Sequence, residues 1–277
     1  MMISFKEFLV ELARRGGTIE HEQFFTKAAV ASDVASIIKG QPWFQDLTAF
    51  IEPSAGGGAL LKHFPGAKGY DLVPQGDDIE QADFLAHEFK TDPSKTLIFG
   101  NPPFGRGGSL ALKFIRKAAT LADTIAFILP RTFAKSSMKN RLPDDFHLVF
   151  EKNLPADSFE SPSGAKLDVL CMFQIWRRGD TKRTKEEFDA TKTSVKFVKP
   201  DQATYAVRRL GDDRSLGKIV SVQAVTTPDS FFFIQDEDGT IKAAIQKSSW
   251  EHIVGTAAKG LKSISRLEFV TEVGKHL

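Results

Sequence analysis

The segment Thr124–Pro130 reads Thr-Ile-Ala-Phe-Ile-Leu-Pro and shows no alternation of polar and apolar positions. A strand that is covered on one face alternates, whereas a strand covered on both faces is apolar throughout. Three more short apolar segments precede it, at 48–52, 67–72 and 96–100. Strands that alternate with helices predict an α/β fold with a mostly parallel, doubly wound, Rossmann-like sheet.

Helices are predicted where apolar residues recur three and four positions apart. These stretches are 3–14, 28–38, 59–64 and 109–122. After residue 145 the alternation stops, because 146–150 and 169–176 predict two strands without a convincing helix between them. We expect these two strands to form an antiparallel pair that closes one edge of the sheet.

The last third of the chain differs from the rest. Residues 177–192 are highly charged and predict a linker or an exposed helix. Beyond them, 230–234 predicts a strand and 241–254 a helix. We therefore expect two domains: a large one over residues 1–180, and a small C-terminal α+β extension over 181–277 that serves substrate recognition.

Composition limits the classes of function. Cys171 is the only cysteine in 277 residues, so the chain forms no internal disulfide, and a reducing cytoplasm is its natural location. The six histidines show no metal-ligand spacing, so no metal site is expected. The start of the chain lacks the layout of a signal peptide, and no apolar run is long enough to cross a membrane.

Distinctive polar residues follow the predicted strands or apolar stretches. They are Glu52, Asp71, Asp83 and Asn101. Ligands of open parallel sheets bind beyond the carboxyl ends of the strands, so these side chains are expected to converge on one site. This convergence is a stronger indication than any single motif.

A glycine-rich loop follows the strand at 48–52. It reads Glu52-Pro53-Ser54-Ala55-Gly56-Gly57-Gly58, and its glycines let a cofactor approach the backbone. The loop lacks the Gly-Lys-Ser/Thr ending of a phosphate loop and the spacing of a dinucleotide fingerprint. Glu52, the acidic residue that precedes the glycines, suits a cofactor with an ammonium group. Asp71, after the next strand, suits the two hydroxyls of a ribose.

The segment Asn101-Pro102-Pro103-Phe104 carries the most specific chemistry. Two prolines fix the backbone and remove N–H donors, which leaves carbonyl oxygens available as acceptors. With the amide oxygen of Asn101, these acceptors suit an amino group whose lone pair must be directed at an electrophile. Phe104 offers a stacking face for a planar base.

These motifs, in this order, resemble those of class I adenine-N6 methyltransferases of the gamma arrangement, with a phage-type DNA adenine methyltransferase as the favoured match. The resemblance covers residues 22–176 and includes Phe25-Thr26 and Asp83-Phe84. It implies a class I methyltransferase sheet, S-adenosylmethionine as the cofactor, and N6 of adenine in nucleic acid as the methyl acceptor. DNA is favoured over RNA, and the target base would be turned out of a duplex.

The resemblance also implies roles for individual residues. The expected catalytic residues are Asn101, Pro102, Pro103 and Phe104. Those expected to bind the cofactor are Phe25, Thr26, Glu52, Pro53, Ser54, Gly56, Gly58, Asp71, Leu72, Asp83, Phe84 and Asn101. The expected substrate contacts are Phe104, Phe159, Lys135 and Lys139. The family often has proline where this chain has Lys27.

Basic residues gather in four clusters although the net charge is only +2. The clusters are 113–117, 131–141, 177–185 and 208–214, and they favour a phosphate-binding face. Three other functions stay open: an RNA adenine-N6 methyltransferase, a protein-glutamine methyltransferase, and a nucleic-acid binder without catalysis. Phe104 counts against the second, which usually has tyrosine there, and the intact Asp71 and Asn101 count against the third.

Overall fold

The computed structural model describes residues 25–160, 166–167, 169–253 and 262–277. The chain divides into two compact units. The first contains residues 1–133 and 138–184, and the second contains 134–137 and 185–277. The helix predicted at 3–14 lies outside the described residues.

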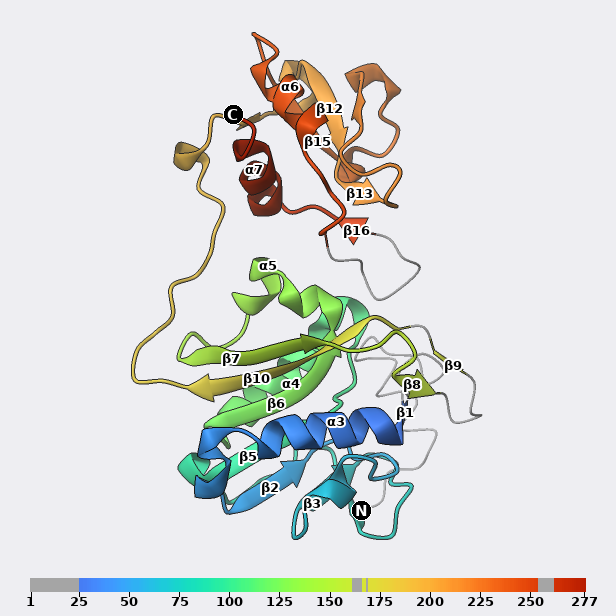
Figure 1. The fold of residues 1–277 in the computed structure, drawn as a ribbon, viewed down its shortest axis with the longest axis vertical. Helices are drawn as coiled ribbons and strands as arrows, with labels where there is room; N and C mark the ends of the chain where they lie inside the picture. Colours follow the sequence, from blue (N-terminus) through green and yellow to red (C-terminus); the bar gives the residue numbers. More distant parts are fainter. Residues whose placement is uncertain (1–24, 161–165, 168, 254–261) are drawn as a thin grey trace. The chain divides into compact units, whose positions relative to one another are not determined.

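A seven-stranded sheet forms the centre of the first unit, in the order β4-β3-β2-β5-β6-β10-β7 (Figure 1). Five strands are parallel, and β10 is antiparallel to both β6 and β7. The fold class predicted from the sequence, a mostly parallel sheet with an antiparallel edge hairpin, is thus confirmed. The strands are β2 Ala49–Glu52, β3 Lys68–Asp71, β4 Ile79–Gln81, β5 Thr96–Gly100, β6 Thr124–Pro130, β7 Phe146–Asn153 and β10 Cys171–Arg178.

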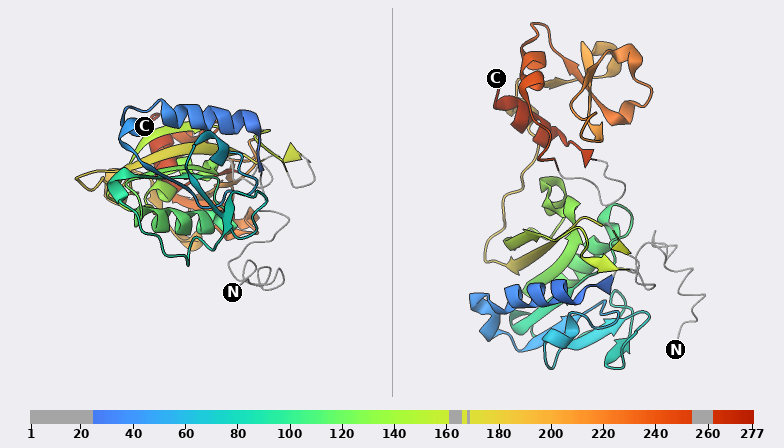
Figure 2. Two further views of the ribbon diagram at one scale, coloured as in Figure 1. Left: turned by 90° about the horizontal axis from the view of Figure 1, so that it is seen from below. Right: turned by 45° about the vertical axis from the view of Figure 1, so that its right-hand side comes forward.

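Helices α3 (Ala28–Lys39) and α4 (Ser109–Ala119) cover opposite faces of this sheet (Figure 2). All seven residues of β6 are buried, as expected for a strand covered on both sides. Helix α3 packs its buried residues, Val34 and Ile38 among them, against Leu97 and Phe99 of β5. The sheet therefore has an apolar core on each face, and polar residues of the sheet lie mainly at the ends of its strands.

Smaller elements complete the first unit. Three short strands form a separate sheet in the order β1-β8-β9: β1 Phe25–Thr26, β8 Phe159–Glu160 and β9 Lys166–Leu167. Helix α5 spans Ser136–Lys139, across the division between the units. The 3-10 turns are Pro42–Asp46, Leu61–His63, Pro93–Lys95, Arg106–Gly108 and Arg131–Ala134. The short helix predicted at 59–64 forms only in part, as the 3-10 turn Leu61–His63, which begins three residues after the positive-φ Gly58.

The second unit is built on a four-stranded antiparallel sheet in the order β11-β15-β12-β14, with helices α6 and α7 packed on one face. Phe232 and Ile234 of β15 contribute to that face, and Phe231 and Phe233 to a smaller apolar cluster on the other. A two-stranded sheet, β13-β16, completes it. The elements are β11 Lys196–Phe197, β12 Tyr205–Arg208, β13 Leu210–Gly211, β14 Ile219–Val220, β15 Phe231–Gln235, β16 Lys262–Ser263, α6 Thr240–Lys247 and α7 Arg266–Gly274.

Two predicted boundaries in this part of the chain were wrong. The helix predicted at 241–254 ends at Lys247, because Ser248 adopts an extended conformation. The predicted linker at 177–192 begins later, since Arg177 and Arg178 belong to β10. Between Arg178 and Lys196 the only regular element is the 3-10 turn Ala190–Lys192, so the alternative of an exposed helix does not hold. Three more 3-10 turns follow, Pro200–Gln202, Val222–Ala224 and Pro228–Ser230.

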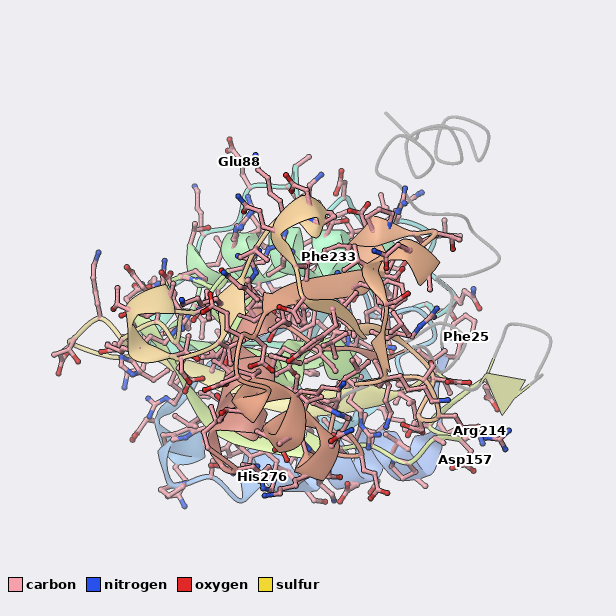
Figure 3. The ribbon with its side chains drawn as sticks, turned by 90° about the horizontal axis from the view of Figure 1, so that it is seen from above. Phe25, Glu88, Asp157, Arg214, Phe233 and His276 are labelled. Atoms are coloured by element: carbon pink, nitrogen blue, oxygen red, sulfur yellow. The ribbon has the colours of Figure 1, made fainter. Side chains whose placement is uncertain are left out.

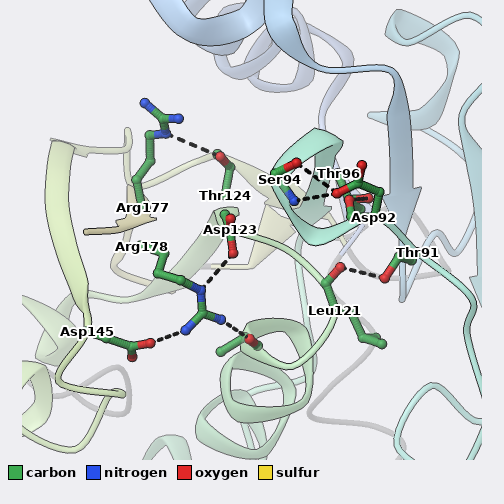
Figure 4. A network of polar contacts seen from close by, with 11 residues as sticks. Thr91, Asp92, Ser94, Thr96, Leu121, Asp123, Thr124, Asp145, Arg177 and Arg178 are labelled. Carbon is green, nitrogen blue, oxygen red and sulfur yellow. Dashed lines mark hydrogen bonds and ion pairs between the residues drawn. The ribbon is translucent and has the colours of Figure 1, made fainter. Parts of the chain in front are cut away.

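Arg178 ties the edge hairpin to the rest of the sheet (Figure 4). Its Nε donates to Asp123 Oδ1 at 2.7 Å, Nη1 pairs with Asp145, and Nη2 donates to the carbonyl of Ala119. The guanidinium therefore joins the end of α4, the start of β6 and the start of β7. Charge-assisted bonds of this kind are stronger than neutral ones.

Replacing Arg178 by alanine is expected to lower the free energy of unfolding by about 2 kcal/mol, because two carboxylates and a carbonyl lose their donor. Urea unfolding followed by circular dichroism measures this. Lys182→Ala is the control: Lys182 Nζ lies 3.3 Å from Asp144, but its side chain is 77% exposed, so little change is expected. If the free energy of unfolding fell equally in the two variants, the three contacts of Arg178 would contribute nothing special to stability.

Candidate active site

The candidate site lies at the carboxyl ends of β2, β3 and β5. The sheet order β3-β2-β5 places the reversal of strand order between β2 and β5, where ligands of open α/β sheets bind. Glu52 is the last residue of β2, Asp71 is the last residue of β3, and Asn101 follows β5 directly. The structure thus brings together at one edge three residues that the sequence predicts to act together.

Glu52 is 2% exposed, and its Oε2 has no hydrogen-bond partner among the described residues. Burial raises the pKa of Glu52 well above its ordinary value; the backbone N–H of Leu61 opposes this rise, and the negative charge of Asp71 adds to it. A Cβ atom at Gly100 would lie 3.2 Å from Glu52 Cγ, so the start of the Asn101 loop lies against this acid. Glu52 is a buried acceptor that suits a cationic group.

The raised pKa of Glu52 predicts a pH-dependent cost to stability. Since the folded chain holds the proton more tightly than the unfolded chain, this carboxyl favours folding most below its unfolded pKa. That contribution is lost as pH rises from the unfolded pKa through the folded pKa. Glu52→Gln removes the titration, so its melting temperature should exceed that of the unmodified chain by more at pH 8 than at pH 5.

Differential scanning calorimetry at the two pH values measures the effect. Glu80→Gln is the matched control, because Glu80 is exposed on the neighbouring strand β4. A Glu52→Gln variant that melts lower than the unmodified chain at pH 8 would contradict this account of the buried acid.

Asp71 holds the glycine-rich loop against β3. Its Oδ2 accepts from the backbone N–H of Gly56 at 2.8 Å, and its Oδ1 accepts from that of Val73 at 2.9 Å. Burial raises the pKa of Asp71, while these backbone donors pull it down. Gly56 has a φ of +53°, which glycine adopts without strain, and a Cβ there would lie 3.2 Å from the ring of Phe25.

The other predicted residues of this region surround the same loop. Gly58 also has a positive φ, of +75°, and its N–H donates to the carbonyl of Ala55 at 2.7 Å. Pro53 is buried at the start of the loop. Leu72 follows Asp71, and its carbonyl accepts from the side chain of Gln81 at 3.0 Å.

Asn101 is positioned by residues that are distant in the sequence. Its Nδ2 donates to Thr26 Oγ1 over 3.4 Å, and its backbone carbonyl accepts from Ser54 Oγ at 3.1 Å. Thr26 is 9% exposed and comes from β1, where it pairs with Phe159 of β8. The sequence predicts that Thr26 and Ser54 bind the cofactor, which stays a prediction; in the structure both contact Asn101.

The two aromatic residues assigned to the target base are buried. Phe104 is 6% exposed and Phe159 is fully buried, and both belong to the core that also contains residues of α3. Stacking on a base therefore requires either ring to leave the core. The carbonyl of Phe104 accepts from the N–H groups of Leu110 and Ala111, at 3.0 and 3.2 Å, which anchors the loop to α4. Of the two prolines between Asn101 and Phe104, Pro102 is buried and Pro103 half-buried.

Asp83 and Phe84 follow β4, a strand that sequence analysis missed. Asp83 Oδ1 accepts from the N–H of Leu85 at 3.0 Å, which shapes a turn at the same edge of the sheet. Phe84 is 1% exposed and packs between Phe89 and Phe114, with ring centroids 5.4 and 5.2 Å away. Their assignment to the cofactor adenine stays a prediction.

Lys135 and Lys139 make ion pairs in the structure. Lys135 is grouped with the second unit, where its Nζ lies 3.5 Å from Glu268 and donates to the carbonyl of Ser263. Lys139 Nζ lies 3.0 Å from Glu151 on β7. Both cations are thus paired with a carboxylate, and their assignment to substrate stays a prediction.

A second glycine-rich segment was not predicted to belong to the site. Gly105, Gly107 and Gly108 follow Phe104 with φ values of +67°, +62° and +76°, and Gly108 is the N-cap of α4. A Cβ on Gly108 would lie 2.8 Å from Phe133 and 3.1 Å from Met138, so glycine is required for this close approach. The spacing Gly-x-Gly-Gly between a predicted loop and a predicted helix was the available signal.

No protein-family model matches the sequence, and a search of curated proteins finds no match either. Solved structures do show similarity. One, described as a class I S-adenosylmethionine-dependent methyltransferase from Listeria monocytogenes, has a TM-score of 0.44 and 16% identity over 65% of this chain and 69% of that one. Another, described as an RNA methyltransferase from Pyrococcus horikoshii, has a TM-score of 0.44 and 17% identity, over 63% of this chain and 99% of that one.

A third similar structure is the methyltransferase subunit of a type I restriction-modification system from Streptococcus thermophilus. It has a TM-score of 0.44 and 16% identity over 63% of this chain and 48% of that one.

In the described part of the chain, no helix is long and apolar enough to cross a membrane. The same residues contain no group of three or more histidine, cysteine or acidic side chains placed to hold a metal ion.

Proposed function

We propose that this chain is an S-adenosylmethionine-dependent methyltransferase that methylates N6 of adenine in DNA. The observation that carries the proposal is the placement of Glu52, Asp71 and Asn101 at the ends of three neighbouring strands, at the reversal of strand order. An acid for a cation, an acid for hydroxyls and an acceptor for an amine then lie at one edge of the sheet.

The residues of the first two strand ends fit the cofactor. The buried Glu52, with one oxygen lacking a partner among the described residues, suits the ammonium group of a methionine moiety. Gly56 and Gly58 form a backbone cradle with positive φ and no side chains. Asp71, already fixed by two backbone donors, retains lone pairs for ribose hydroxyls.

Asn101 would hold the target amine. When bound, S-adenosylmethionine supplies an electrophilic methyl group, which the amine lone pair takes as the S–C bond breaks, and the product then loses a proton to solvent. The amide oxygen of Asn101 and the carbonyl of Pro102 accept the two amine hydrogens, which directs the lone pair and stabilises the developing positive charge. The contacts of Asn101 with Thr26 and Ser54 fix this loop before substrate binds.

The test is transfer of radiolabelled methyl groups from S-adenosylmethionine to duplex DNA, single-stranded DNA and structured RNA in parallel. Digestion to nucleosides then identifies the product by chromatography. N6-methyladenine in DNA is the expected result. The same product in RNA alone would retain the chemistry but overturn the choice of DNA.

A peptide arm completes the assay. Label on a glutamine-containing peptide, with none on nucleic acid, would overturn the adenine assignment. Calorimetric titration with S-adenosylmethionine measures cofactor binding separately. A chain that binds nucleic acid but shows no heat of cofactor binding would overturn the enzymatic proposal altogether.

A further inference from the structure

Charge is segregated along the sequence between residues 71 and 143. From 71 to 92 the chain is rich in acids, and Glu88 among them points away from the ribbon (Figure 3). From Asn101 to Pro143, Asp123 is the single acidic residue. The basic residues of that second stretch are Arg106, Lys113, Arg116, Lys117, Arg131, Lys135, Lys139 and Arg141.

Several basic residues of the clusters at 177–185 and 208–214 make contacts within the protein. Arg178 is paired with two carboxylates, and Arg183 donates to the carbonyls of Lys139, Leu142 and Phe146 at 2.5, 3.1 and 2.9 Å. In the second unit, Arg208 lies 4.9 Å from the ring of Phe231. These residues stabilise the fold, so the basic clusters at 177–185 and 208–214 are mainly structural.

Five basic residues around α4 make no ion pair with a carboxylate of the described residues. They form what we call the α4 basic surface: Arg106, Lys113, Arg116, Lys117 and Arg141. All are exposed except Lys117, which is half-buried. Lys113, Arg116 and Lys117 are spaced three and four positions apart, so they project from one side of α4. Arg116 Nη2 donates to the carbonyl of Arg141 at 3.4 Å, which places these two residues side by side.

The surface begins next to the candidate site. Arg106 lies in the glycine-rich segment directly after Phe104, and α4 starts three residues later. Buried apolar residues cover the inner side of the helix, Leu110, Phe114 and Ile115 among them, so its basic side faces outward. Cations without counter-charges at such a position favour a polyanion that also reaches Asn101.

We propose that the α4 basic surface binds the phosphodiester backbone of duplex DNA. This rests on the proposed function, and it names the residues that hold the substrate. Proteins that bind single strands combine basic grooves with exposed aromatic side chains for base stacking. The large apolar side chains that are exposed in the described residues are Val149 and Leu277, neither of them aromatic. A charged surface without stacking faces favours the backbone of a duplex.

The test compares two double charge reversals that change net charge equally. Lys113→Glu with Arg116→Glu alters the α4 basic surface, whereas Lys68→Glu with Lys90→Glu alters exposed lysines outside it. Binding of a fluorescent 20-base-pair duplex is measured by anisotropy over a range of salt concentrations, without cofactor. We expect the first variant to lose at least about tenfold in affinity and to reduce the salt slope by about 2, and the second to change little.

Several outcomes would overturn the proposal: unchanged affinity and slope in the α4 variant, equal losses in the control, or tighter binding of single strands or duplex RNA. Lys113→Gln with Arg116→Gln, followed by thermal melting, separates lost binding from lost folding. If duplex DNA binds through α4 but no N6-methyladenine forms, the α4 basic surface stands as a DNA-binding surface and the proposed function is overturned. If the charge-reversed variant methylates DNA as fast as the unmodified chain, the proposed function stands and the role of the α4 basic surface is overturned.

Discussion

Replacement of Asn101 by alanine is expected to slow methyl transfer by about 1,000-fold, with little change in cofactor affinity. The amide is the side-chain acceptor of the proposed catalytic loop, and loss of one preorganised hydrogen-bonding group from an active site commonly costs this much in rate. We expect the substitution to affect transfer more than folding, because Asn101 is only partly buried and the contact of its side chain with Thr26 is long, at 3.4 Å. Single-turnover kinetics with saturating S-adenosylmethionine measures the rate, and calorimetry measures cofactor binding.

Asn153→Ala is the control for this prediction. Asn153 is an exposed asparagine at the end of β7, where its Oδ1 accepts from Arg131 Nε at 3.1 Å. The control should transfer methyl groups at close to the unmodified rate. If Asn101→Ala retained more than about a tenth of the rate, the loop would not be the site of transfer.

Asp71→Ala should weaken binding of S-adenosylmethionine by about 100-fold, or about 2.7 kcal/mol. Two effects add: the ribose hydroxyls lose a charged acceptor, and the N–H groups of Gly56 and Val73 lose the carboxylate that holds the loop. Isothermal titration calorimetry gives the affinity, and the melting temperature reports how much of the loss is structural.

A suitable control lies in the same connection. Asp78→Ala removes an exposed acid just before β4, and its cofactor affinity should match that of the unmodified chain. A fall in melting temperature with unchanged cofactor affinity in Asp71→Ala would mean that Asp71 only supports the loop.

The central strands could be predicted because their sequences leave few alternatives. Thr96–Gly100 and Thr124–Pro130 are apolar runs bounded by turn residues, and both form strands with those bounds. The antiparallel pairing of β7 with β10 followed from the missing helix between them. Strand β4 was missed because Ile79–Gln81 has one buried residue and two exposed ones, so its pairing with β3 leaves almost no apolar pattern.

The site could be predicted in part. Glu52, Asp71 and Asn101 could be placed because strand ends converge in a parallel sheet. Long-range contacts were beyond prediction: Thr26 reaches Asn101 only through pairing of β1 with β8, and two-residue strands leave no periodicity to detect. The ion pairs of Lys135 and Lys139 could not be predicted either, because their carboxylate partners lie on other elements.

The position of β10 has a consequence for how the chain is synthesised. This strand comes last along the sheet-forming sequence, yet it lies between β6 and β7, and β7 pairs with no other described strand. Until Arg178 has left the ribosome, β6 is an uncovered edge made entirely of residues that the finished fold buries. Expression of a shortened chain that ends before β10 should therefore yield aggregates, and nascent chains stalled before that point should bind chaperones.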